Sequence, residues 1–282
     1  MRIGISLAPM HLGRDKYKAL KKAGFDTLDF NLADTDIPPY TLSDEDFISY
    51  LKEEKLAAEA ARISIHQVHG PWCWPIREST PEGLAERLSS MKKCVLATSI
   101  LGAKYMVIHP IMPNGIEERD DKEKSKDTVE KNISFMADLA SYAEETGVVV
   151  CLENMPFPKF TIASPKEIAD IVYAVNSESF KMCLDTGHSV IFKEWQPSVA
   201  IEKYSDIIKT LHVHDNRGRE DEHLLPLANG IINWKDFSDA LKKNDFDGVL
   251  SLECAPGKKL PSDVFEDFLC SYAKLCKYLT VM

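Results

Sequence analysis

The sequence predicts an α/β protein folded as a (β/α)8 TIM barrel, and three observations lead to that prediction. Eight short apolar runs, rich in β-branched residues, alternate with longer segments of helical periodicity. The runs are continuously apolar, which is typical of parallel strands covered on both faces. Eight such units are the number that closes into a barrel. Because no linker or internal repeat divides the chain, we expect a single domain over residues 1–282.

The predicted elements follow one another in regular order. The strands cover residues 3–7, 26–32, 63–70, 105–110, 148–155, 181–188, 207–215 and 248–254. The main helices cover residues 14–24, 43–62, 80–103, 125–147, 164–175, 233–244 and 262–279. Several of these helices begin at Ser, Thr or Asn and stop at Gly, which are preferred cap residues. The sixth unit is the weakest, since residues 192–204 offer only a short helix.

Composition excludes several classes of protein. With 44% hydrophobic and 28% charged residues, the chain has ample material for a folded core. The apolar amino terminus is too short for a signal peptide, and no stretch is long enough to span a bilayer, so we expect a cytoplasmic protein without a membrane partner. Seven cysteines without a CxxC pair argue against a disulfide framework. P-loop, GxSxG and HExxH motifs are absent from the sequence.

The carboxyl ends of the predicted strands carry side chains that bind divalent metals. In a (β/α)8 barrel these ends meet at one face, which is the face where such enzymes have their active sites. Glu153, Asp185, His214 and Glu253 come from strands five to eight in order. Three carboxylates and one imidazole suit zinc, manganese or magnesium. The sequence therefore predicts a divalent metal centre formed by these four residues.

Further residues offer a metal the same kinds of ligand atom. Two histidines end earlier strands, one follows Asp185 by three positions, and two residues lie in the loop after strand seven. They are His69, His109, His188, Asp221 and His223. With these residues as ligands the chain could hold one to three metals. For each of them a simpler role is open: hydrogen bonding to substrate or to a ligand, or solvation in a loop.

Two kinds of chemistry fit such a centre. In the first, Glu153 and Glu253 act as base and acid, taking a proton from the carbon next to a carbonyl and returning it from the other side, while the metal stabilises the enediolate. In a lyase variant of this chemistry the same enolate expels a hydroxyl group. In the second, several metals activate water against a phosphodiester, which needs more than four ligands.

Some neighbouring residues are candidates for substrate contact, and others are not. Trp72 could form an apolar wall against a sugar ring, or it could simply cover the barrel mouth. Arg217 could hold a phosphate or carboxylate, although most such loop residues are solvated. His66 is expected to point away from the barrel interior if His69 points into it, and His212 is expected one layer below His214. We therefore expect His66 and His212 to be packed and hydrogen-bonded residues rather than catalytic ones.

Four motifs make the chain resemble a known superfamily. They are CLEN at residues 151–154, CLDTGH at 183–188, LHVHDN at 211–216 and SLEC at 251–254. On these motifs the chain resembles, over its whole length, the xylose isomerase-like TIM barrel superfamily of sugar phosphate isomerases and epimerases, inosose dehydratase and endonuclease IV.

The resemblance implies two possible ligand sets. The ketose epimerase branch implies a metal held by Glu153, Asp185, His214 and Glu253, with the glutamates as acid and base and His188 touching substrate. The endonuclease IV branch implies three zinc ions shared among these residues and the other candidates at strand ends and in the strand-seven loop. Every ligand type of that second set is present.

Departures from the endonuclease pattern favour the sugar branch. That pattern has Asn-Asp-Ser-Lys after the strand-seven histidine, where this chain has Asp215, Asn216 and Arg217. The loop at residues 33–46 carries acids and no base, and the net charge is −10, so nucleic acid is not an expected partner. Many small-sugar members also carry Asp-x-His before a Pro-Gly motif that residues 225–234 resemble, so Asp221 and His223 do not by themselves indicate a nuclease, although Leu227 stands where that motif usually has glycine.

We therefore predict a metal-dependent isomerase or epimerase of a small sugar, sugar phosphate or polyol. An endonuclease IV-like multi-zinc phosphodiesterase and a dehydratase of the inosose or dehydroshikimate type are the alternatives. A small carbohydrate is the expected partner of the chain. The sequence leaves the oligomeric state open.

Overall fold

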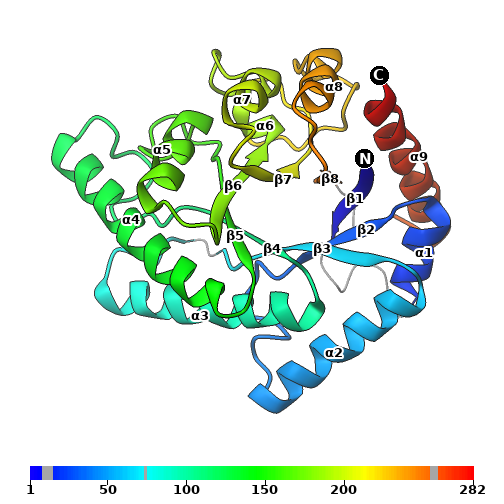
Figure 1. Ribbon diagram of the computed structural model, residues 1–282, viewed down its shortest axis with the longest axis horizontal. Helices are drawn as coiled ribbons and strands as arrows, with labels where there is room; N and C mark the ends of the chain where they lie inside the picture. Colours follow the sequence, from blue (N-terminus) through cyan, green and yellow to red (C-terminus); the bar gives the residue numbers. More distant parts are fainter. Residues whose placement is uncertain (8–14, 73–74, 255–259) are drawn as a thin grey trace.

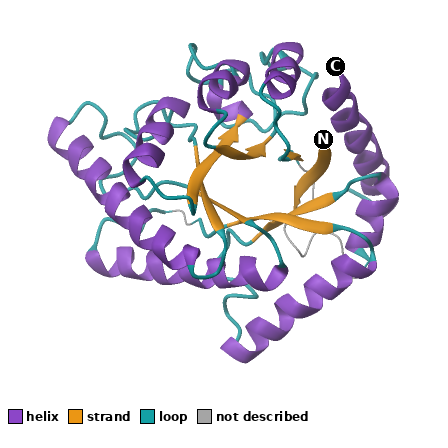
Figure 2. Ribbon diagram, in the orientation of Figure 1, coloured by secondary structure: helices purple, strands orange, loops and turns teal. Residues whose placement is uncertain are grey.

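The computed structural model describes residues 1–7, 15–72, 75–254 and 260–282, and these form a ring of parallel strands surrounded by helices (Figures 1 and 2). The strands are β1 Arg2–Leu7, β2 Thr27–Asn31, β3 Ser64–His69, β4 Tyr105–Ile108, β5 Val149–Glu153, β6 Phe180–Asp185, β7 Ile208–His212 and β8 Val249–Leu252. The helices are α1 Lys16–Ala23, α2 Asp44–Ala60, α3 Pro81–Leu101, α4 Lys122–Glu144, α5 Pro165–Val175, α6 Thr186–Ser189, α7 Pro197–Tyr204, α8 Trp234–Lys243 and α9 Ser262–Val281.

The strands form one eight-stranded sheet in the order β7-β6-β5-β4-β3-β2-β1-β8, with every pairing parallel. The two edge strands of this sheet, β7 and β8, meet just beyond the end of β7 and close the barrel. There Val213 N donates to Ser251 O at 2.8 Å, and Glu253 N donates to Val213 O at 3.0 Å. The predicted (β/α)8 TIM barrel is therefore confirmed.

Helix ends follow the cap residues that the sequence predicts. Ser43 accepts a hydrogen bond from Asp46 N at the start of α2, and Thr80 accepts one from Gly83 N at the start of α3. Gly102 ends α3 with φ of 76°, a left-handed conformation that glycine adopts without strain. The sixth unit contains two short helices, α6 and α7, in place of the one expected.

Apolar side chains fill the space between the strands and the helices. Ile3, Ile5 and Leu7 of β1 are buried in one large cluster with residues of the surrounding helices. Val107, Cys151 and Cys183 form a second, small cluster apart from it. No helix in the described part of the chain is long and apolar enough to cross a membrane.

The pairing of β6 with β7 decides which side chains reach the mouth of the barrel. A shift in register between Met182 and Cys183 brings Asp185 opposite His212. Since alternate residues of a strand face the same side, His212 lies level with the acids that end the neighbouring strands. His214 lies two residues farther on, beyond the end of β7.

Candidate metal centre

Four donors from consecutive strands meet at the carboxyl end of the barrel. They are Glu153, Asp185, His212 and Glu253, and one ligand atom of each lies within 4.8 Å of the others. His212 Nδ1 is 2.8 Å from Glu153 Oε1 and 3.0 Å from Glu253 Oε2. The Glu153 and Asp185 side chains are at most 1% exposed. This arrangement offers a cation three carboxylates and one imidazole.

The histidine of this group differs from the one that the sequence predicts. We expected His214 among the three acids and His212 one layer below, and the structure places His212 there instead. The reason is the register of β6 with β7, in which Asp185 pairs with His212. Among the ion pairs of the described residues, His214 pairs with one of the three acids, with its Nε2 2.9 Å from Asp185 Oδ2.

Two predicted histidines adjoin Glu153 from the other side. His109 Nε2 is 3.2 Å and His69 Nε2 is 3.9 Å from Glu153 Oε2. These three residues form a second possible metal-binding group. Trp72 meets the His109 ring edge-on with centroids 4.6 Å apart, so it covers this side of the site.

A third group contains His188, His214, Asp221 and His223. Asp221 Oδ1 lies 3.1 Å from His188 Nε2 and 2.9 Å from His223 Nε2. The His214 ring stacks on that of His223, with centroids 4.0 Å apart. Unlike the strand-borne donors, Asp221 and His223 lie in the loop after β7 and are partly exposed.

Gly187 makes room for this third group. A Cβ atom on Gly187 would lie 2.1 Å from Cε1 of the His214 ring, which is far inside van der Waals contact. Glycine at this position of the DTGH motif therefore leaves space for the His214 ring to lie against the backbone of residue 187. A positive φ is not the reason for it.

Backbone carbonyls lie beside Nδ1 of four histidines of the site, and Nδ1 of His214 is 3.2 Å from Asp215 O. Nδ1 of His69, His188 and His223 lies 2.9, 2.8 and 2.7 Å from the carbonyl oxygens of Gly70, Asn154 and Glu253 respectively. A hydrogen on Nδ1 that donates to a carbonyl leaves Nε2 facing the acids, with its lone pair available to a metal.

The acids raise the pKa values of two histidines of the site, whereas burial lowers that of His109. Burial alone would lower the pKa of His212, but the Glu153 and Glu253 carboxylates hold it well above its usual range. Burial alone would raise the pKa of Glu253, but His212 lowers it to about 2. Burial alone would also lower the pKa of His188, but the Asp185 and Asp221 carboxylates outweigh burial and raise this pKa to about 9.

These observations fit a divalent cation. Three carboxylates surround one imidazole, and the buried Glu153 Oε2 makes no hydrogen bond although His109 is near it. A buried carboxylate oxygen without a hydrogen bond is costly, and a cation would compensate it. The residues present therefore suit a metal of the zinc, manganese or magnesium kind.

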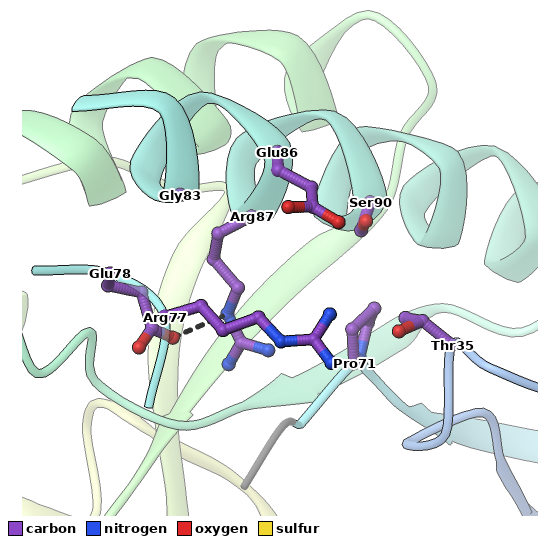
Figure 3. A pocket seen from close by; sticks show the side chains of 8 residues that line it. All are labelled: Thr35, Pro71, Arg77, Glu78, Gly83, Glu86, Arg87 and Ser90. Carbon is purple, nitrogen blue, oxygen red and sulfur yellow. Dashed lines mark ion pairs between the residues drawn. The ribbon is translucent and has the colours of Figure 1, made fainter. Parts of the chain in front are cut away.

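Other residues near the mouth have different environments. Arg217 is exposed and paired with Glu222 of its own loop. A hollow of about 330 Å³ opens beside Pro71, where the buried Arg87 and Glu78 lie with their charged groups 3.4 Å apart (Figure 3). Acids and bases both line this hollow, so it shows no preference for one sign of charge.

Sequence reasoning missed two features of the centre. One is His212, and the other is the buried pair Asp29 and Gln67 beneath it. An acid inside the apolar run TLDFN was the available signal for Asp29, since a buried carboxylate needs a partner.

Comparisons with known proteins agree with the fold. A family model described as "Xylose isomerase-like TIM barrel" matches residues 17–269. An uncharacterized protein of Methanocaldococcus jannaschii is 34% identical over 176 residues, which cover 60% of this chain and 64% of that protein. The chain thus matches just under two thirds of the length of that relative.

Relatives with descriptive names fall into two groups. The chain is similar to an inosose isomerase of Bacillus velezensis, at 25% identity over 214 residues that cover 72% of this chain and 73% of that one. It is also similar to a probable endonuclease 4 of Mycoplasmopsis synoviae, at 22% identity over 229 residues covering 75% and 77%. A solved D-psicose 3-epimerase of Clostridium cellulolyticum superposes with a TM-score of 0.78 at 19% identity, covering 99% of each chain.

Proposed function

Because the chain belongs to the xylose isomerase-like TIM barrel family, we propose that it is a metal-dependent isomerase or epimerase of a small sugar, sugar phosphate or polyol. The observation that carries the proposal is the group of Glu153, Asp185, His212 and Glu253 at the barrel mouth. The similarity to an inosose isomerase supports it.

In this proposal the four residues hold one divalent metal, which would polarise the substrate carbonyl and stabilise the charge that develops on its oxygen. Glu153 and Glu253 exchange a proton with the carbon next to that carbonyl, one as base and the other as acid. His109 Nε2, 3.2 Å from Glu153 Oε2, is close enough to share the proton that this oxygen receives. Trp72, edge-on to the His109 ring, covers that side of the site.

His188 has a different part in the proposal. Its Nδ1 is anchored on Asn154 O at 2.8 Å, and its Nε2 faces the mouth next to Asp221. Because the Asp185 and Asp221 carboxylates outweigh burial and raise its pKa to about 9, the ring is protonated near neutral pH, and Nε2 is oriented to donate a hydrogen bond to a substrate hydroxyl. Arg217 serves as a substrate contact only if a phosphorylated substrate draws it away from Glu222.

Exchange of solvent deuterium into substrate tests this function. The purified protein, loaded with manganese or zinc, is incubated in deuterated water with a panel of ketoses, inososes and their phosphates. We expect deuterium at the carbon next to the carbonyl of one substrate, and loss of that exchange in Glu153→Gln and Glu253→Gln. Glu118→Gln is the matched control, because Glu118 is also a buried glutamate but accepts its hydrogen bond from Thr161 N, outside the centre.

The outcomes separate the chemical alternatives. Exchange with an isomeric product supports an isomerase or epimerase, and exchange with loss of water identifies a dehydratase. Unchanged exchange in both glutamine variants would contradict acid-base roles for Glu153 and Glu253. No exchange with any substrate of the panel would count against the function.

A second candidate function is a multi-zinc phosphodiesterase of the endonuclease IV type. One observation favours it: the three donor groups are contiguous, since Glu153 belongs to two of them and Asp185 Oδ2 lies 2.9 Å from His214 in the third. Metal content per chain distinguishes the candidates, because three zinc ions per chain and nicking of an abasic-site duplex are expected for this function alone.

A further inference from the structure

Asp29 is a buried acid below the candidate metal centre. It lies in β2, is 1% exposed, and is not one of the four donors at the mouth. Its Oδ2 is 2.9 Å from His212 Nε2 and accepts a hydrogen bond from Gln67 Nε2 at 2.8 Å. The carboxylate of β2 thus reaches across the barrel interior to the imidazole of β7.

The two ring nitrogens of His212 face different partners. Nδ1 faces Glu153 Oε1 and Glu253 Oε2, where a cation would be held, and Nε2 faces Asp29. An ionised carboxylate accepts hydrogen bonds and donates none. Facing Asp29, Nε2 therefore keeps the hydrogen whenever the ring carries only one, so a metal that displaces the Nδ1 proton finds the lone pair on Nδ1.

We propose that Asp29 is a positioning residue that keeps the hydrogen of His212 on Nε2 and so makes Nδ1 the metal ligand. The inference rests on the proposed metal centre. A carboxylate behind a metal-binding imidazole also makes the ring a stronger donor, and loss of such an outer partner typically weakens metal binding 10–100-fold.

Gln67 and His69 hold this pair in place. The Gln67 amide donates to the same oxygen of Asp29 that faces His212, and so fixes the carboxylate from the side of β3. The His69 ring lies parallel to that of His212, with an interplanar angle of 8° and centroids 5.5 Å apart. The stacked His69 ring therefore limits tilting of the His212 imidazole, and the contact of Asp29 with Nε2 keeps Nδ1 directed toward Glu153 and Glu253.

The isosteric variant Asp29→Asn tests the inference, because an amide can present either a donor or an acceptor to Nε2. We expect its dissociation constant for Zn²⁺ or Mn²⁺, measured by competition with a chromophoric chelator, to rise about 10–100-fold. Asp26→Asn is the matched control: Asp26 precedes the same strand, accepts a hydrogen bond from Ile3 N at 3.1 Å, and loses the same charge on substitution. Equal affinities of the two variants would overturn the inference.

Nuclear magnetic resonance supplies a readout that does not depend on activity. In protein labelled with ¹⁵N at its eight histidines, the His212 signals are assigned by their absence from a His212→Asn variant. We expect a hydrogen-bonded Nε2–H proton in wild type with and without zinc, and its shift or loss in Asp29→Asn. A wild-type protein with zinc on Nε2, or with no protected Nε2–H, would overturn the inference even if Asp29→Asn fails to fold.

The same measurements separate this inference from the proposed function. If wild type binds no divalent metal, the proposed centre fails, while the Nε2–H proton of the metal-free protein still tests the contact with Asp29. If wild type binds metal and Asp29→Asn binds it as tightly as Asp26→Asn, the centre stands and the positioning role fails.

Discussion

His188 and His212 at the carboxyl end of the barrel and His66 near its amino end have opposite electrostatic environments. At the carboxyl end, carboxylates outweigh burial and raise the pKa values of His188 and His212. At the amino end, burial and then Arg2 lower the pKa of His66 to about 4, with Arg2 Nη2 3.3 Å from the His66 Nδ1. His66 and His69 belong to the same strand. Neighbours, rather than residue type or strand, therefore decide which histidines suit a cation site.

The largest expected difference between the two ends is in metal binding. His212→Asn should weaken binding of the first zinc or manganese by more than the roughly 10–100-fold that loss of an outer partner costs, because it removes a ligand from among three carboxylates. His66→Asn should leave the dissociation constant unchanged. Isothermal titration of metal-free protein measures both.

His214→Asn sharpens this result. If His212 is the ligand of the strand-borne centre, His214→Asn should retain that first metal. Loss of the first metal in His214→Asn together with its retention in His212→Asn would contradict the assignment of His212.

The next effect concerns packing at the carboxyl end. Gly187→Ala would place a methyl group against the His214 ring, so we expect a loss of about 1–3 kcal/mol in the free energy of unfolding, as for other overpacked sites. Gly147→Ala is the control, since a Cβ there meets nothing within 4 Å and only its φ of 72° opposes alanine. Urea unfolding measures both, and equal losses would contradict a specific clash with His214.

A pH effect should arise at the amino end. Because the folded-state pKa of His66 is about 4, below the unfolded value near 6.5, the unfolded chain takes up a proton first as pH falls. The stability that neutral His66 contributes is present above pH 6.5 and is lost between about pH 6.5 and 4. From pH 7 to 4.5 the free energy of unfolding should therefore fall by about 2 kcal/mol less in His66→Gln than in wild type. Parallel losses would show that His66 does not titrate in this window.

The smallest effect concerns the loop that carries Asp221 and His223. Leu227 has φ of 63°, a left-handed conformation that is costly for a side chain with Cβ, and it is 44% exposed. Leu227→Gly should raise stability by about 0.5–1 kcal/mol. The same change at the exposed helical Leu56 should lower stability by about 1 kcal/mol. A melting temperature that falls in both variants would contradict strain at Leu227.

The sequence alone determined the barrel and the acids of its rim. Continuous apolar runs and alternating helices fix a parallel sheet covered on both faces, and Glu153, Asp185 and Glu253 each end or follow a strand in that pattern. These features are local, because each depends on one segment and its own periodicity.

Only the tertiary structure decided between His212 and His214, and only it brought Asp29 to the site. His212 and His214 are two residues apart, so the alternation of side chains along a strand places both on the same face. That alternation alone does not show which of the two lies at the level of Asp185. The pairing shift between Met182 and Cys183 settles that level. Asp29 meets His212 across the barrel from a strand 183 residues away in sequence. Register and closure are properties of the whole sheet, since they arise from hydrogen bonds between strands that no single segment specifies.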